Sequence, residues 1–83
     1  MRYSPGQVWS ILVNGSDDLD EVIDIRQAMH SLTAQEQTFL TLLASGQTGK
    51  YAMHEARLRG NQTTLKQRCL TRMAAVLDNG ESE

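Results

Sequence analysis

Side chains that form directed hydrogen bonds are concentrated between residues 62 and 68. The polar and basic members of this stretch are Gln62, Thr63, Thr64, Lys66, Gln67 and Arg68. Such residues hydrogen-bond base edges and phosphate oxygens, with glutamine suited to adenine and lysine to guanine. Apolar residues recur at helical spacing in and beyond the same stretch, at Leu65, Cys69, Met73 and Val76. The spacing predicts a helix with one buried stripe and an outward polar face.

A turn signal lies directly before this helix. Gly60 suits the left-handed residue that ends a helix, and Asn61 suits the N-cap of the next one. An earlier helix, capped by Thr48, is expected to run to Leu58. Two helices joined by a tight turn predict a helix-turn-helix, a motif whose second helix enters the major groove of DNA.

The expected roles of individual residues follow from their positions on this motif. Base reading is assigned to residues that precede or oppose the buried stripe, namely Gln62, Thr63, Lys66 and Gln67. Phosphate contact is assigned to a hydroxyl at the helix start and to nearby cations, namely Lys50, Arg57, Arg59, Thr64 and Arg68. The alternative for all of these residues is a solvated helix face.

Three further helices are expected upstream, which makes the predicted fold all-α: a compact bundle of about five helices with a C-terminal helix-turn-helix. Each upstream helix begins with a capping signal: Ser4 with Pro5, Asp18 with Glu21, and Thr33 with Glu36. We interpret residues 1–83 as one helical domain. It would hold N-terminal helices in 1–31, the helix-turn-helix core in 32–77 and a flexible tail in 78–83.

Charge is distributed unevenly along the chain. The net charge is −2, yet residues 46–77 contain six basic residues and one acidic residue, a local balance of +5. Residues 1–45 contain two basic and six acidic residues. The positive charge therefore coincides with the predicted DNA-reading segment, as expected of a nucleic-acid interface.

Several classes of protein are disfavoured by the composition. No apolar run approaches the ~20 residues that span a bilayer, so we expect no membrane partner. The single cysteine, Cys69, excludes an internal disulfide and indicates a reducing, cytoplasmic location. His30, His54 and Cys69 lack zinc-ligand spacing. We therefore expect no metal, no cofactor and no catalysis, and we interpret Cys69 as an inert core thiol.

Several segments, taken in order, resemble one known family. Residues 24–32 read DIRQAMHSL, residues 32–36 read LTAQE and residues 39–43 read FLTLL. These segments are similar to the lead-in and first helix of region four of bacterial sigma factors. Residues 46–48 (GQT) resemble the start of that family's helix-turn-helix, and residues 64–68 (TLKQR) resemble its recognition helix.

The resemblance implies a small transcription regulator that binds double-stranded DNA and that can also contact RNA polymerase. No core-polymerase-binding or promoter-melting region precedes residue 24, so we do not expect a complete sigma factor. The alternative is a protein-interaction module that binds RNA polymerase or another regulator rather than DNA. DNA binding would weaken steeply with salt, whereas protein binding would depend on apolar anchors.

Two aromatic residues near the N-terminus bear on the alternative function. Trp9 and Tyr3 are candidates for a protein interface, because exposed aromatic residues are common anchors. The competing interpretation of Trp9 is a core or groove-filling residue. A homodimer formed through the N-terminal helix would bring two DNA half-sites together and would add stability to a small domain.

Overall fold

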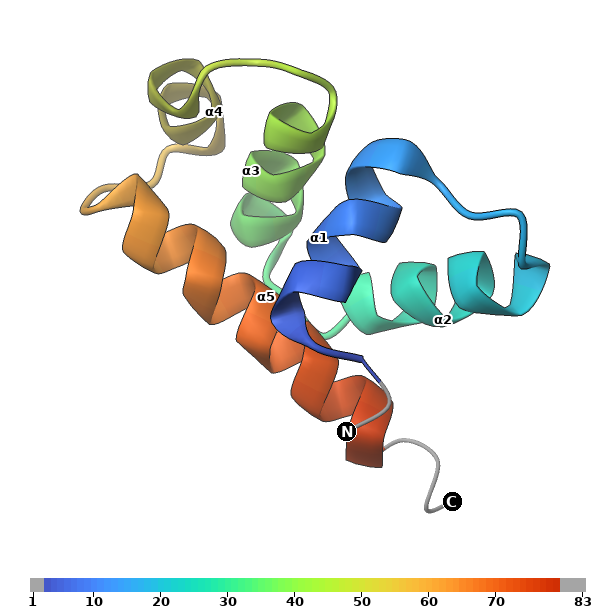
Figure 1. Ribbon diagram of the computed structural model, residues 1–83. Coiled ribbons are helices and arrows are strands. Elements are labelled where there is room, and N and C mark those ends of the chain that lie inside the picture. Colours follow the sequence, from blue (N-terminus) through green and yellow to red (C-terminus); the bar gives the residue numbers. More distant parts are fainter. Residues whose placement is uncertain (1–2, 80–83) are drawn as a thin grey trace.

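The computed structural model describes residues 3–79, which form five α-helices in the order of Figure 1. These are α1 (Pro5–Asn14), α2 (Leu19–Met29), α3 (Ala34–Ala44), α4 (Gly49–Ala56) and α5 (Gln62–Asn79). The all-α class and the number of helices expected from the sequence are confirmed for this range. No helix within it is long and apolar enough to cross a membrane.

The long helix α5 is the element on which the bundle is assembled. The short helix α1 packs across α5, and α2 packs against both of them (Figure 1). The helices α3 and α4 pack closely together, and α3 also contacts α1 and α5. As a result α2 and α4 lie on opposite sides of the bundle, with α5 extending from the α4 side toward the α2 side (Figure 1).

The core is built where α1, α3 and α5 meet. Val8, Phe39, Leu40 and Met73 are completely buried, and Leu70 is 2% exposed. Burial of each large apolar side chain stabilises the fold by about 1.5–3 kcal/mol relative to exposure. Phe39 and Leu40 confirm the expectation that the third helix is the central core helix.

Local capping explains where most helices begin. The Ser4 hydroxyl accepts from Gln7 N while the Gln7 side chain accepts from Ser4 N, and Thr33 and Glu36 form the same reciprocal capping box. The second helix differs from expectation. Asp18 caps Asp20 N, but the Glu21 carboxylate accepts from the Ser16 hydroxyl at 2.6 Å instead of completing a box.

Two helix ends differ from the sequence-based expectation. The fourth helix ends at Ala56, before Leu58, because Arg57 takes the left-handed conformation at φ 57°. The fifth helix continues through Asp78 and Asn79, residues that were assigned to a flexible tail. The rest of that predicted tail, residues 80–83, lies outside the described residues.

The buried face of α5 is rotated from the predicted stripe. Cys69 and Met73 are buried as expected, but Leu65 and Val76 are only half-buried. The remaining buried positions are Leu70, Ala74 and Leu77. The rotation accompanies the packing of α1 and α2 against α5, a tertiary arrangement that periodicity alone does not specify.

Candidate nucleic-acid interface

The fourth and fifth helices are joined by a short, well-defined turn. Thr48 begins α4 by accepting from Tyr51 N, and Asn61 begins α5 by accepting from Thr64 N at 3.0 Å. Both N-caps were predicted from the sequence. Residues 57–61 form the turn between α4 and α5, with Gly60 at φ 111°.

Hydrogen bonds fix the conformation of this turn. Leu58 N donates to Met53 O and Arg57 N donates to His54 O, so two carbonyls in the last turn of α4 are satisfied. The Gln35 side chain of α3 also donates to Arg57 O at 3.3 Å. Arg57 holds the left-handed position that glycine usually occupies at a helix end. The Arg57 side chain is exposed, and these hydrogen bonds hold the backbone from which it projects.

The outward face of α5 carries polar and basic side chains over three helical turns. Thr64, Gln67, Arg68 and Thr71 are all exposed and line a shallow depression, with Thr63 at one end and Arg72 beside it. The sequence argument had included Thr63, Thr64, Gln67 and Arg68, but it missed Thr71 and Arg72. The signal for them was present, because they continue the Gln67 and Arg68 positions by one helical turn.

Lys66 lies on a different side of α5. Its Nζ is 4.0 Å from the centroid of the Trp9 ring, a cation–π contact between α5 and α1. Lys66 is half-buried and is one turn from the buried residues Cys69 and Leu70. The structure therefore does not bring Lys66 together with Gln67 on the outward face, contrary to the expected grouping.

Gln62 also occupies a position that the sequence did not indicate. Its side chain lies against Gly49 at the start of α4, where a Cβ atom on residue 49 would overlap it. The atoms that a Cβ would meet are at the end of the exposed Gln62 side chain, so that side chain would shift to admit a larger residue at position 49. Gln62 thus bridges the starts of α4 and α5 and remains exposed.

The other predicted phosphate-contacting cations are exposed around the turn and on α4. Arg57 and Arg59 lie in the turn, and Lys50 lies in the first turn of α4. Tyr51 follows Lys50 and is 45% exposed. Its hydroxyl donates to the Glu55 carboxylate at 3.4 Å. The exposed cations therefore flank the start of α5.

The aromatic residues proposed as protein anchors are both engaged within the fold. Tyr3 is only 5% exposed and its hydroxyl donates to Asp24 of α2 at 3.4 Å, so it is not available as a surface anchor. The reason is that α1 and α2 close over it. Trp9 is half-buried, packs against the core and is covered by Lys66, in agreement with a groove-filling role.

Cys69 is a buried thiol next to the outward face. It is 1% exposed. Burial, and then the charge and hydrogen bond of the Glu36 carboxylate, raise the pKa of Cys69 from 9.0 to about 11. Arg68 and Arg72 act in the opposite direction on this pKa. A thiol with this pKa is protonated at neutral pH, so it is a poor nucleophile.

We expect native Cys69 to be almost unreactive toward a chromogenic disulfide reagent at pH 8. With a pKa of about 11, only roughly one thiol in a thousand is ionised at that pH. The Glu36→Gln variant keeps a capping-box residue and removes the charge, so its thiol pKa should fall below about 11 but stay above 9.0, because burial, the largest cause of the shift, remains. Reaction of the native thiol as fast as that of the urea-unfolded chain would contradict the buried position.

The same pKa shift links folding to pH. The folded thiol retains its proton above the pH at which the unfolded thiol releases it. The contribution of Cys69 to stability is therefore complete below pH 9 and is lost as the pH rises toward 11. Comparison of wild type with Cys69→Ala in urea titrations at pH 8 and pH 10.5 isolates this contribution.

The described residues contain no group of three histidine, cysteine, aspartate or glutamate side chains that could hold a metal ion. Comparison of the chain with protein-family models, with curated proteins and with solved structures gave no match. The surface formed by the turn, α4 and α5 is the candidate functional site of the described residues.

Proposed function

We propose that this protein is a small transcription regulator that binds double-stranded DNA by placing α5 in the major groove. The observation that carries the proposal is the outward face of α5. Its exposed side chains from Thr63 to Arg72 are hydroxyls, an amide and guanidinium groups, while its large apolar side chains face inward or are half-buried. Similarity of about residues 24–77 to region four of sigma factors supports the same function.

The proposed contacts divide by chemistry. Gln67 is central on the outward face and is suited to a bidentate contact with adenine, which discriminates by about 1–3 kcal/mol. Arg68 and Arg72 on α5 and Arg57 and Arg59 in the turn would neutralise phosphates on either side of the groove. Thr64, near the N-terminus of α5, would donate to a phosphate where the helix dipole favours an anion.

Lys66 is not assigned to base reading in this proposal. Its ammonium group lies over Trp9, and leaving that position would expose the ring and part of the packing between α1 and α5. The base-reading group becomes Thr63, Gln67 and Thr71, with Gln62 at the edge.

The test is selection from a randomised duplex library, followed by affinity measurements across a salt series. We expect one enriched motif and a slope of log affinity against log salt of about −0.9 for each phosphate contacted. Arg68→Ala should reduce that slope by about one contact. Gln67→Ala should relax specificity at one base position while changing the slope little.

Two further variants sharpen this test. Arg57→Gly removes a cation and supplies the residue best suited to a left-handed position, so it should weaken DNA binding without lowering stability. Lys66→Met is the charge-matched control, because it removes one positive charge from the side of α5 that faces Trp9. If Lys66→Met lowers the affinity for DNA as much as Arg68→Ala does, the outward face is wrongly assigned.

Absence of any salt-dependent DNA binding at low ionic strength would refute the proposed function. Binding of the same protein to purified RNA polymerase would then favour the alternative of a protein-interaction module.

A further inference from the structure

The start of α2 presents an apolar side chain to solvent. Leu19 is 69% exposed, more than any other large apolar residue in the range 3–79, and Ile23 one turn later is 42% exposed. Apolar residues at this helical spacing usually belong to the buried stripe of a helix. Leu19 stands between Asp18 and Asp20, so its exposed side chain is flanked by carboxylates. Exposure of such a pair of apolar residues is a typical feature of an interaction surface.

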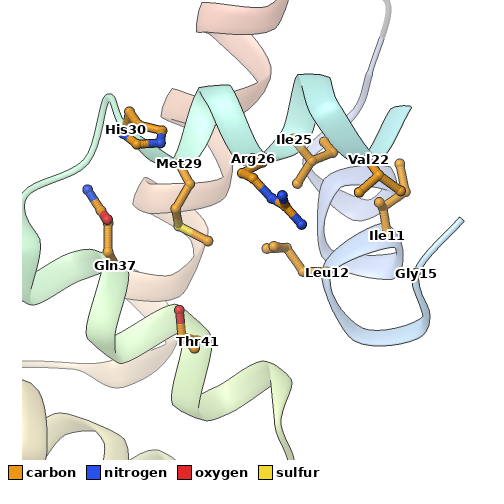
Figure 2. Close-up of a pocket in the computed structure, with 10 residues that line it drawn as sticks. All are labelled: Ile11, Leu12, Gly15, Val22, Ile25, Arg26, Met29, His30, Gln37 and Thr41. Carbon is orange, nitrogen blue, oxygen red and sulfur yellow. The ribbon is translucent and has the colours of Figure 1, made fainter. Parts of the chain in front are cut away.

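An apolar groove opens beside the other half of the same helix. It lies between α1, α2 and α3 and has a volume of about 410 Å³ (Figure 2). Leu12 of α1 and Val22 and Met29 of α2 form part of its wall. Figure 2 shows the Arg26 side chain extending from α2 into the space between α2 and α1, while His30 lies at the far end of the helix.

The groove and the exposed leucine carry complementary charge. None of the described residues that line the groove has a carboxylate. Arg26, which lines it, is the only lysine or arginine among residues 3–49. An apolar side chain flanked by acidic residues therefore fits this groove by both shape and charge, and Leu19 with Asp18 and Asp20 is such a group.

We propose that α2 is a homodimerisation surface, on which α2 of a second copy of this chain packs antiparallel. Leu19 and Arg26 are seven residues apart, which places them on the same side of the helix and about 10 Å apart. A two-fold axis near Ile23 brings Leu19 of each copy to the groove of the other copy. The same axis places Asp20 of each copy at the same level along α2 as Arg26 of the other, within reach of the long arginine side chain.

This arrangement is isologous, so every contact occurs twice. Two apolar insertions and two ion pairs then stabilise one small interface, with the Ile23 side chains meeting near the axis. The surface lies on the opposite side of the bundle from α4 (Figure 1). Dimerisation does not depend on the proposed DNA contacts, and it would leave α4 exposed in both copies.

Sedimentation velocity of the complete chain without DNA tests the dimer directly. We expect reversible association of the 9.3 kDa monomer within about 1–500 μM, the range typical of a small interface. Leu19→Asp should weaken association by about tenfold or more without loss of helical circular dichroism, because the side chain is exposed. Val13→Asp is the matched control, since Val13 is 44% exposed but does not line the groove, and it should associate as wild type does.

A charge exchange identifies the antiparallel pairing. Asp20→Arg and Arg26→Asp should each remain monomeric alone, because each places like charges in both contacts. An equimolar mixture of the two variants should form a heterodimer with two ion pairs, one in the native order and one reversed. A wild-type chain that stays monomeric up to about 500 μM, or a mixture that associates no better than its components, would overturn the proposal. Neither result would depend on whether the protein binds DNA.

Discussion

Replacement of Phe39 by alanine is expected to lower the free energy of unfolding by about 3–5 kcal/mol. Phe39 is completely buried in α3, the helix that packs against α4, α1 and α5. Its removal takes apolar area out of the core and leaves a cavity that five short helices cannot close without moving apart. A domain of this size has a total stability of only about 4–12 kcal/mol, so the variant should be largely unfolded at modest urea concentrations.

Urea titration followed by circular dichroism and by the fluorescence of Trp9 measures this loss. Phe39→Leu keeps most of the volume and should cost no more than about 1.5 kcal/mol, which provides a folded variant if alanine is not tolerated. Thr38→Ala, at the exposed neighbouring position, should change stability by no more than about 0.5 kcal/mol. A Phe39→Ala variant as stable as Thr38→Ala would show that α3 is not the centre of the core.

The second large effect is expected at Trp9. Trp9→Ala should lower the free energy of unfolding by roughly 2–4 kcal/mol, somewhat less than for a fully buried tryptophan because the ring is half-exposed. Lys66→Ala should cost about 1 kcal/mol through loss of the cation–π contact and of the packing of the lysine stem. Lys66→Met keeps the apolar stem and should cost less than Lys66→Ala.

A double-mutant cycle on Trp9 and Lys66 decides between two interpretations of Lys66. If the ammonium group stays over the ring in solution, the two substitutions should couple by about 0.5–1 kcal/mol. Coupling close to zero would mean that Lys66 leaves Trp9 and is available to a ligand. It would then return to the base-reading group together with Gln67, and the assignment of the outward face would have to be revised.

Lys66 and the arginines of α5 lie on different sides of the helix. A lysine near the middle of the buried side of α5 covers a tryptophan, while hydroxyls, an amide and arginines occupy the outward side. Arginine is the better residue for phosphate contact and for planar recognition of guanine, because its guanidinium group donates in a fixed fork. The exposed cations of the α5 face and the turn, Arg57, Arg59, Arg68 and Arg72, are all arginines.

Local interactions are the part of this structure that the sequence determined by itself. Ser4, Thr33, Thr48 and Asn61 each cap the helix they were expected to cap, because a capping side chain needs only an amide two or three residues away. Gly46 likewise ends α3 at φ 100°, where glycine has no steric penalty. The number of helices and the all-α class follow from these signals and from apolar periodicity.

Tertiary packing alone decided which side of each helix is buried. Apolar residues occupy more than half of the circumference of α5, so periodicity was compatible with several choices of buried side. Contact with α1 and α2 selected the buried side that is centred near Met73. On α2 the same process buried Ile25 and Ala28 and left Leu19 and Ile23 in solvent. Tyr3 became a core residue because α2 supplies a partner 21 positions away in the chain.

Tertiary packing also determined which side chains form the outward face of α5 and why Lys66 is not among them. Residue type marks lysine as polar, but its four-carbon stem can be buried while the ammonium group finds an aromatic ring. That ring belongs to Trp9 on another helix, which no local pattern on α5 encodes. The sequence therefore located the polar segment from 62 to 68, and the packing of α1 against α5 determined which of its side chains face outward.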